Sequence, residues 1–282
     1  MKAGDMLPYQ RMFCENGVKA MRKKLILLVA LALALTVMLL LRGKGKHRAE
    51  GDEADTPQQA AQNDPAGDAQ HTPDPIGAMT ANENGGVDIT VTAEDGTATV
   101  YTFTDVSADA WYAEAVDYAV SSGVMSGDDA QKLFRPEYGV ERSQFAVIIY
   151  RFAGGEPAVE RASFSDLTGD EWYYDYINWM VQQKLMGGVD GGAFQPDEFL
   201  SCEQALIVLY RLAGEPEING TLEDYPYAPK VSDSGRDAVT WAWNNGLITE
   251  KECVWYPTQA VSRAQVALLL MRYDALIGRN AE

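Results

Sequence analysis

Three stretches of eleven residues carry the strongest pattern in the sequence: FRPEYGVERSQ at 134–144, FQPDEFLSCEQ at 194–204 and WYPTQAVSRAQ at 255–265. Each begins with an aromatic residue, has a proline two residues later and ends on glutamine. Their prolines are 60 and 61 residues apart. A fixed period of this kind is the signature of a protein built from repeated units that pack on one another. The sequence therefore predicts three equivalent units, which we place at residues 103–156, 162–216 and 229–278.

Each unit is expected to form two helices. In the first helix of the first unit, Ala115, Val116 and Ala119 follow the i, i+3, i+4 spacing of a helix with one apolar face. The second helices are apolar nearly all round, which predicts that they are buried. Two of them begin with a Ser-x-x-Gln capping box, ending on Gln204 and Gln265. We therefore predict an all-α fold of three helical-hairpin repeats, with the second helices in a central three-helix bundle.

The charge of the chain is divided very unevenly. The 282 residues carry 23 Lys and Arg against 41 Asp and Glu, a net charge of −18. Residues 1–48 hold 10 basic and 2 acidic side chains. The remaining residues hold 13 basic and 39 acidic side chains. An acidic body lacks the positive surface that nucleic-acid backbones require, so no nucleic-acid partner is expected.

The basic end resembles a membrane anchor. Leu25 to Leu41 is a run of 17 residues in which only Thr36 is polar. At about 1.5 Å per residue it is long enough to cross a bilayer, and basic residues stand on both sides of it. We expect an uncleaved signal anchor at 25–41 behind a basic segment at 1–24, with the repeats outside the cell. The alternatives are a cleaved signal peptide, which would leave a secreted, wall-associated protein, and a true start at Met21.

Between the anchor and the repeats, residues 42–86 are rich in Ala, Gln, Asp, Glu, Pro and Gly. Such a composition buries too little apolar surface to fold, so a disordered acidic linker is expected. Residues 87–102 then alternate apolar and polar side chains on both sides of Asp95-Gly96. This pattern predicts a short β-hairpin ahead of the first unit.

Several kinds of chemistry are disfavoured. The two histidines, His47 and His71, lie outside the repeats, which excludes Ser-His-Asp and Cys-His catalysis there. The three cysteines have no metal spacing and form no disulfide framework. Carboxylates are abundant, but no pair stands out as a glycosidase site. We therefore expect no enzymatic activity, no cofactor and no metal.

At this point the residues resemble a known family. Phe103-Thr-Asp105, the Trp111-Tyr112 pair six residues later, Gly123-Val-Met-Ser-Gly127 and Phe134-Arg-Pro136 are similar to the S-layer homology domain. Such domains typically occur as triplets. The resemblance implies a pseudo-threefold spindle that binds secondary cell-wall polysaccharide in its grooves without a covalent bond. That polymer commonly carries a negatively charged pyruvate ketal.

The candidate ligand-binding residues recur at equivalent places in the units. Arg142 and Arg263 stand one residue past a helix cap, where free N–H groups and a guanidinium can converge on an anion. The alternative is an internal pair with a carboxylate such as Asp105 or Asp166. Cys202 replaces this arginine in the second unit, which predicts a weakened or silent groove. The complete candidate set is Arg142, Arg263, Asp105, Asp166, Asp233, Trp111, Trp172, Gln144 and Gln265.

Two of these groups also have structural interpretations. Trp111 and Trp172 either stack on sugar rings or pack in the core. The three aspartates either accept hydrogen bonds from sugar hydroxyls or fix the loop before the first helix. At the level of the whole protein, the alternative to wall binding is a membrane-anchored scaffold that binds another protein.

Overall fold

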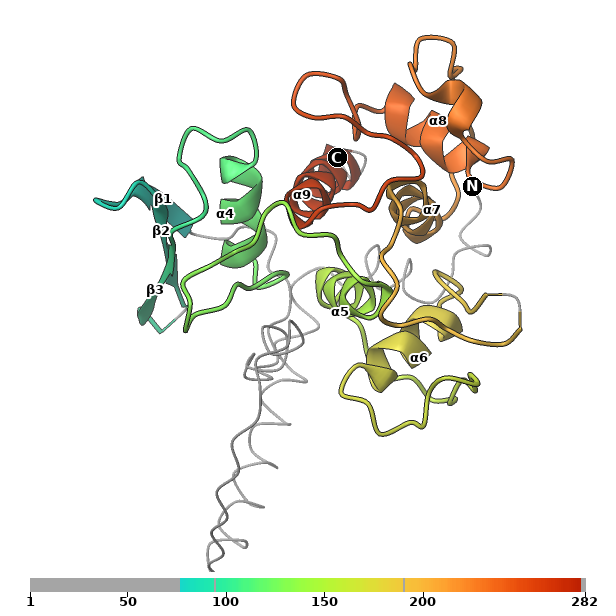
Figure 1. Cartoon of the computed structure of the whole chain (residues 1–282), viewed down its shortest axis with the longest axis horizontal. Coiled ribbons are helices and arrows are strands. Elements are labelled where there is room, and N and C mark those ends of the chain that lie inside the picture. Colours follow the sequence, from blue (N-terminus) through green and yellow to red (C-terminus); the bar gives the residue numbers. More distant parts are fainter. Residues whose placement is uncertain (1–76, 94, 190, 280–282) are drawn as a thin grey trace, which may run out of the picture. The chain divides into compact units, whose positions relative to one another are not determined.

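Six α-helices and a three-stranded antiparallel sheet make up residues 77–93, 95–189 and 191–279, the part of the chain that this computed structural model describes (Figure 1). All described residues belong to one compact unit of the chain. The strands are β1 (Gly77–Ala81), β2 (Val87–Thr92) and β3 (Ala98–Phe103). The helices are α4 (Ala113–Ser121), α5 (Arg142–Phe152), α6 (Tyr174–Gln182), α7 (Cys202–Leu212), α8 (Arg236–Asn244) and α9 (Arg263–Arg279), with a short 3₁₀ helix η1 (Ala228–Lys230) before α8. The fold is therefore helix-rich with a small sheet, rather than all-α.

The helices form an inner and an outer set. Figure 1 shows α5, α7 and α9, the second helices of the three units, nearest the middle, with α4, α6 and α8 around them. The main helix contacts pair α6 with α5, α8 with α7 and α4 with α9. Each outer helix thus packs on the inner helix of another unit, so the helical hairpins expected within single units are not the packing units. The cause is the long connection from outer to inner helix, which runs from residue 122 to 141 in the first unit.

Backbone hydrogen bonds join the three units in a closed ring. The N–H of Val140 donates to the carbonyl of Val261, Val261 donates to Leu200, and Leu200 donates back to Val140, each at 2.9 Å. All three side chains are fully buried. Each unit therefore supplies one donor and one acceptor at the same point, and the ring closes only with all three units in place.

A second set of bonds surrounds this ring at the starts of the inner helices. The first N–H groups of a helix have no partner within it and must find one elsewhere. Here they donate to the proline loop of a neighbouring unit: Arg142 to Glu198 at 2.9 Å, and Ser143 to Pro196 at 3.0 Å. The equivalent bonds are Cys202 to Gln259, Glu203 to Pro257, Arg263 to Tyr138 and Ala264 to Pro136. The repeated proline loops are therefore the caps of the neighbouring inner helices.

The predicted capping boxes are present as well. Gln204 accepts from the N–H of Ser201 at 3.0 Å, and the Ser201 hydroxyl accepts from the N–H of Gln204 at 3.2 Å. Gln265 and Ser262 form the same reciprocal pair. Together with the loop bonds, these boxes satisfy the exposed donors of each helix start.

The sheet changes the expected end of the linker. β2 and β3 form the hairpin that the alternation predicted, with Val87 opposite Phe103. However, β1 lies in the stretch assigned to the linker and pairs with β2, so the prediction of disorder is wrong for residues 77–86. The polar composition misled because β1 needs little apolar surface of its own. It gains backbone hydrogen bonds from β2, and α4 packs against both strands.

The expected membrane segment at 25–41 and the linker up to residue 76 lie outside the described residues. Among the helices that are described, none is both long and apolar enough to span a bilayer.

A pair of neighbouring glycines offers a matched test of the packing. A Cβ on Gly188 would come within 2.7 Å of both the Phe164 ring and the carbonyl oxygen of Ala193, whereas a Cβ on Gly187 would meet nothing within 4 Å. We expect Gly188→Ala to lower the free energy of unfolding by about 1–3 kcal/mol, because overpacking forces its neighbours to move. Gly187→Ala should change it by less than about 1 kcal/mol. Urea unfolding of the full chain measures both, and equal effects would contradict this packing.

Candidate functional site

Arg142 and Arg263 each bind the loop of another unit. Nε of Arg142 donates to the carbonyl of Phe194 at 2.9 Å, and Nη2 donates to Gly187 at 2.8 Å. Nε and Nη2 of Arg263 bind the carbonyls of Phe134 and Ser126 in the same way, at 2.8 and 2.5 Å. Each guanidinium also lies over the ring of the phenylalanine whose carbonyl it binds, 4.8 and 4.6 Å from the centroid. The arginines therefore fasten the units together.

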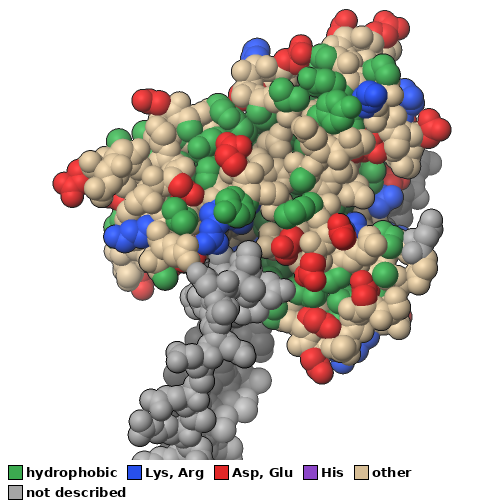
Figure 2. Space-filling model, in the orientation of Figure 1, with side chains coloured by type: hydrophobic (Ala, Val, Ile, Leu, Met, Phe, Trp, Pro, Cys, Tyr) green, Lys and Arg blue, Asp and Glu red, His purple; other side chains and the backbone are tan. Residues whose placement is uncertain are grey.

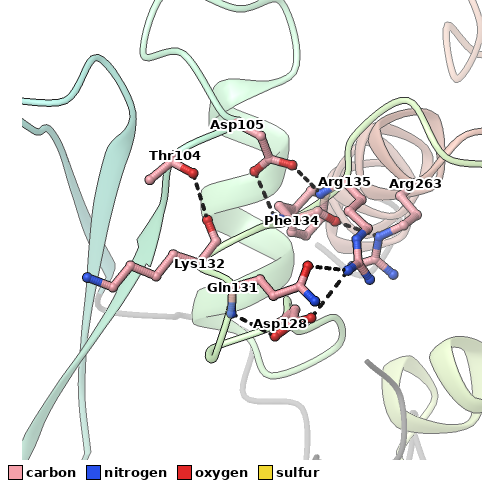
Figure 3. Close-up of polar contacts among 8 residues, drawn as sticks. All are labelled: Thr104, Asp105, Asp128, Gln131, Lys132, Phe134, Arg135 and Arg263. Atoms are coloured by element: carbon pink, nitrogen blue, oxygen red, sulfur yellow. Dashed lines mark hydrogen bonds and ion pairs between the residues drawn. The ribbon is translucent and has the colours of Figure 1, made fainter. Parts of the chain in front are cut away.

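Asp105 and Asp166 complete the same motif from the other side. The two carboxylate oxygens of Asp105 accept from the N–H groups of Phe134 and Arg135 at 2.8 and 2.7 Å (Figure 3). Asp166 holds the N–H groups of Phe194 and Gln195 at the same two distances. These contacts are the loop anchoring that the sequence left open. They hold Arg135 and Gln195 at φ near +60°, a backbone conformation that is uncommon for residues with side chains.

One part of the sequence argument is wrong. We expected free N–H groups at the starts of the arginine-bearing helices, ready to bind an anion. In the structure the N–H groups of Arg142 and Ser143 bind carbonyls of the second unit, and those of Arg263 and Ala264 bind carbonyls of the first. The neighbouring unit caps these helices, and the sequence of a single unit does not predict this because the acceptor carbonyls lie in another unit. The internal carboxylate pair is not what forms either, because the guanidinium groups bind backbone carbonyls.

Both arginines are cations whose pKa is lowered by burial. Burial lowers the pKa of Arg142, and the nearby charge of Asp166 partly offsets it. Burial also lowers the pKa of Arg263, to about 10, and the positive charge of Arg135 adds to the effect. Desolvation acts to raise the pKa of Asp166, but the N–H groups of Phe194 and Gln195, together with Arg142, bring it below its usual value. Across the described residues, no carboxylate lies within ion-pair distance of Arg142 or Arg263.

We call each place where the start of an inner helix meets the proline loop of another unit a corner, and the third corner is built differently. Cys202 stands at the arginine position and cannot reach the carbonyl of Trp255, which corresponds to Phe134 and Phe194. The hydroxyl of Tyr225 donates to that carbonyl instead, in a short buried hydrogen bond. Tyr225 comes from the segment before η1, and its 30-residue separation from Trp255 gives no sequence signal of the contact. The corner is thus filled by an internal tyrosine.

The start of the third unit also departs from the pattern. Asp233 is exposed, and the loop is held instead by the buried carboxylate of Glu203, which accepts from the N–H of Ser232 at 2.9 Å and from its hydroxyl. Gly235 caps α8, where Tyr112 and Tyr173 cap α4 and α6. A Cβ on Gly235 would lie 2.4 Å from the Glu203 side chain, so the tyrosine of the other units does not fit at this position.

A cavity of about 230 Å³ lies beside Arg263. We call it the Arg263 groove. All three units line it, and the side chains most relevant to binding are Arg135, Tyr138, Gln144, Trp172, Phe199 and Arg263. Trp172 is 38% exposed, and Tyr138 and Phe199 are more exposed still. The groove therefore combines accessible aromatic faces with three arginines, Arg135, Arg151 and Arg263, and with two acidic residues, Asp128 and Glu141.

Three of the nine predicted residues line this groove, namely Arg263, Trp172 and Gln144. Asp105 supports it from behind by holding the backbone of Arg135 (Figure 3). Arg142 and Asp166 occupy the equivalent corner between the first and second units, and Gln265 bridges Ser262 to the carbonyl of Val254. Trp111 is partly buried and packs edge-on against Tyr112, with 5.2 Å between ring centroids.

Arg135 is one of the groove residues that sequence reasoning missed, together with Tyr138 and Phe199. Its guanidinium is held by Asp128 at 3.3 Å and by Gln131 at 2.8 Å (Figure 3). The signal was present in the sequence, since Arg135 stands between the repeated aromatic residue and proline, where the other units have Gln195 and Tyr256. The face in Figure 2 carries scattered acidic side chains and fewer basic ones, whereas the cavity is lined by three arginines against two acidic residues.

Comparisons with known proteins agree with the repeat pattern. A family model described as "S-layer homology domain" matches residues 102–146 and 163–206, and the third unit lies outside these segments. The chain is 25% identical over 184 residues to the S-layer protein sap of Bacillus anthracis, covering 64% of this chain and 22% of that protein. It is 32% identical over 139 residues to the surface-layer 125 kDa protein of Lysinibacillus sphaericus, covering 49% and 12%.

A third relative is the cellulosome-anchoring protein of Acetivibrio thermocellus, 31% identical over 83 residues, which are 28% of this chain and 19% of that protein. The chain thus spans less than a quarter of the length of each of these relatives.

The arginine contacts predict a stability effect. Arg142→Ala leaves the carbonyls of Phe194 and Gly187 without their donors, so we expect the free energy of unfolding to fall by about 2–4 kcal/mol. Arg135→Gln places in the first unit the residue that the second unit has, and should cost less than about 1 kcal/mol. Urea unfolding of the full-length variants measures both. An Arg142→Ala variant as stable as the parent chain would show that the fastening contributes nothing.

The two described cysteines should be unreactive. Burial raises the pKa of Cys202 to about 12 and that of Cys253 to about 11. At pH 8 about one in a thousand Cys253 thiols is then ionised, and fewer at Cys202, and the thiolate is the reactive form. In a Cys14→Ser variant we expect iodoacetamide to label the native protein slowly, and faster as the pH rises towards 11. Labelling at the rate of a free cysteine at pH 8 would contradict the burial.

Proposed function

Because this chain is an S-layer homology domain protein, we propose that it binds cell-wall polysaccharide without catalysing a reaction, and that the Arg263 groove is its main binding site. The observation that carries the proposal is the meeting of Arg135, Arg263 and Trp172, from three different units, in one open cavity. The names of the relatives, which include surface-layer proteins and a cellulosome anchor, support attachment at the cell surface.

The chemistry of the groove fits an acidic sugar. Trp172 and Phe199 offer flat apolar faces that suit the C–H surface of a pyranose ring. Arg263 has two of its N–H groups on backbone carbonyls, which are neutral acceptors, and so keeps its net positive charge. Arg135 lies close enough to lower the pKa of Arg263. An anionic substituent would relieve this repulsion, and a pyruvate ketal carries the carboxylate that a guanidinium binds well.

The three corners are unequal in this respect. The corner of Arg142 meets the third unit, where Ser234 stands in place of the tryptophan, one residue before Gly235, the N-cap of α8. The corner of Cys202 meets the first unit, which has Trp111, but it lacks the arginine. We propose that the units form the pseudo-threefold spindle that the family resemblance implies, and that only the Arg263 groove unites the cation with an exposed tryptophan.

The proposal extends to the placement of the protein. The repeats would lie outside the cell against the wall, and the apolar run at 25–41 would anchor the chain in the membrane. The protein would then hold membrane and wall together. If Leu25 to Leu41 is instead cleaved, the repeats alone would hold a secreted protein at the wall.

Co-sedimentation with purified cell walls tests the groove. We expect Trp172→Ala and Arg135→Gln each to weaken binding of the full chain about tenfold, equivalent to about 1.4 kcal/mol. Raising the salt from about 0.1 to 1 M shortens the screening length from about 10 to 3 Å and should weaken the parent chain as well. Neither variant removes a bond that fastens the units, so the helical circular dichroism signal should be retained.

Trp111→Ala is the matched control, since it removes the equivalent tryptophan from the corner without an arginine, and it should bind as the parent does. Walls whose anionic polysaccharide has been extracted with acid should no longer retain the protein. If Trp172→Ala and Arg135→Gln sediment like the parent, the groove is not the binding site. If extracted walls bind equally well, the ligand is not the acidic polymer, and a protein partner becomes the better explanation.

A further inference from the structure

A second cavity, of about 70 Å³, lies in the third unit and the segment before it. We call it the Trp255 pocket. Its lining includes four aromatic side chains, one carboxylate and one aliphatic hydroxyl: Tyr225, Tyr227, Trp243, Trp255, Glu250 and Thr249. None of the residues that line the Arg263 groove lines it, so it is a separate site.

Two coupled substitutions distinguish this region from the other units. At the equivalent place in the first unit, a Cβ on Gly127 would lie 2.3 Å from the ring of Phe103, and the second unit repeats this contact at Gly188. The third unit has Val231 in place of the phenylalanine and Glu250 in place of the glycine. The smaller valine removes the ring that demanded glycine, and a carboxylate side chain lines the pocket.

The charge of this pocket is opposite in sign to that of the Arg263 groove. Of the described residues, no Lys or Arg lines it, and Glu250 is exposed and makes no ion pair within the described ranges. The neighbouring Glu252 is neutralised by Arg272 at 2.6 Å. The hydroxyl of Thr249 donates to Glu252 at 2.5 Å. The pocket therefore offers one unpaired negative charge beside an aromatic lining.

The aromatic rings are inclined to one another. The ring of Tyr225 lies 5.9 Å from that of Tyr227 with 80° between their planes, and 5.1 Å from that of Trp243 at 51°. Tyr227 and Trp243 are half-buried, so part of each ring is accessible. Inclined rings present π faces in more than one direction, and a cation is attracted to such a face when it lies within about 6 Å of the ring centroid.

We propose that the Trp255 pocket binds a quaternary ammonium group of the choline type. The methyl groups, which carry the positive charge, lie against the rings of Tyr227 and Trp243, and the carboxylate of Glu250 attracts the charge. Aromatic rings around a weakly hydrated cation are the general means by which proteins recognise quaternary ammonium ligands. The site is independent of the polysaccharide binding proposed for the Arg263 groove, because the two cavities share no residue.

Size, charge and hydrogen bonding distinguish this ligand from the alternatives. A cavity needs about 10–15 Å³ for each water-sized group, so the pocket holds roughly five to seven such groups, which suits a trimethylammonium group with a two-carbon arm. A primary ammonium carries three N–H donors and a tight hydration shell that an aromatic lining does not replace, whereas a quaternary ammonium has no N–H group. An anion would meet the charge of Glu250 without a lining cation to bind it.

Saturation-transfer NMR on the full chain tests the proposal, with choline chloride as the probe and a detergent that carries no choline group. Two small molecules are the controls: 3,3-dimethylbutan-1-ol, the neutral isostere with carbon in place of nitrogen, and ethanolamine, which lacks the methyl groups. We expect saturable binding of choline with the strongest transfer to its N-methyl groups. Both controls should bind at least about tenfold more weakly, equivalent to about 1.4 kcal/mol.

Two pocket variants and one matched control locate the site. Glu250→Gln, at an exposed position, should keep the fold and weaken choline about three- to fivefold, the loss expected for one solvated charge pair. It should not change the weak binding of the neutral isostere. Tyr227→Leu keeps an apolar side chain but removes the ring, and should weaken choline by a similar factor. Tyr138→Leu makes the same change in the Arg263 groove and should bind choline as the parent chain does.

A last comparison separates two sources of the group. Phosphatidylcholine vesicles present it as a lipid head group, and dextran substituted with choline esters presents it on a soluble polymer. The source is the carrier that retains the parent chain better than it retains Glu250→Gln. The proposal is overturned if choline shows no saturable binding, if the neutral isostere binds equally well, or if neither carrier distinguishes the parent from Glu250→Gln. It is also overturned if Tyr138→Leu weakens choline binding while Tyr227→Leu does not.

Discussion

The closed ring of backbone hydrogen bonds among Val140, Leu200 and Val261 is the constraint on which the rest of this structure depends. Each residue donates to one unit and accepts from the other, so no single unit satisfies its own buried polar groups. The helix starts that follow the ring obey the same logic, since their first N–H groups bind the proline loop of a neighbour. Repeat units that leave their own buried hydrogen-bonding groups unpaired are expected to fold together. The candidate groove forms only in that assembly, because all three units line it.

A series of hydrogen bonds through the proline loop fixes the positions of the groove residues. Asp105 holds the backbone of Arg135, the carbonyl of Phe134 binds Arg263, and Arg263 belongs to the third unit. A cation of one unit is thereby positioned by an acid of another through two residues of the loop. The third corner satisfies the equivalent carbonyl differently: Cys202 stands at the arginine position, and the hydroxyl of Tyr225 donates to the carbonyl of Trp255. The corner without an arginine therefore still leaves this buried carbonyl with a hydrogen-bond donor.

Much of the local structure could be predicted from sequence because local signals agreed with one another. The apolar spacing marked the outer helices, and the Ser-x-x-Gln boxes marked the starts of α7 and α9. The strand β1 was missed because its residues carry little apolar surface, and its stability comes from pairing with β2. The partners of Arg142 were missed because they are backbone carbonyls at residues 187 and 194, which have no side-chain signature. Arg135 was missed because attention to repeated identities passes over a position at which the three units differ.

The threefold repeat, the positions and burial of its inner helices, and the resemblance to the S-layer homology domain all follow from the amino-acid sequence, since periodicity and capping are properties of short segments. The three-dimensional fold was needed to show that outer helices pack on the inner helices of other units, that the arginines bind loop carbonyls, and that Trp172 lines a groove with Arg263. It also decided that the third unit exchanges a Phe–Gly contact for a pocket beside Trp255. These features depend on groups that are far apart in the sequence and meet only in space, so no short segment contains both partners.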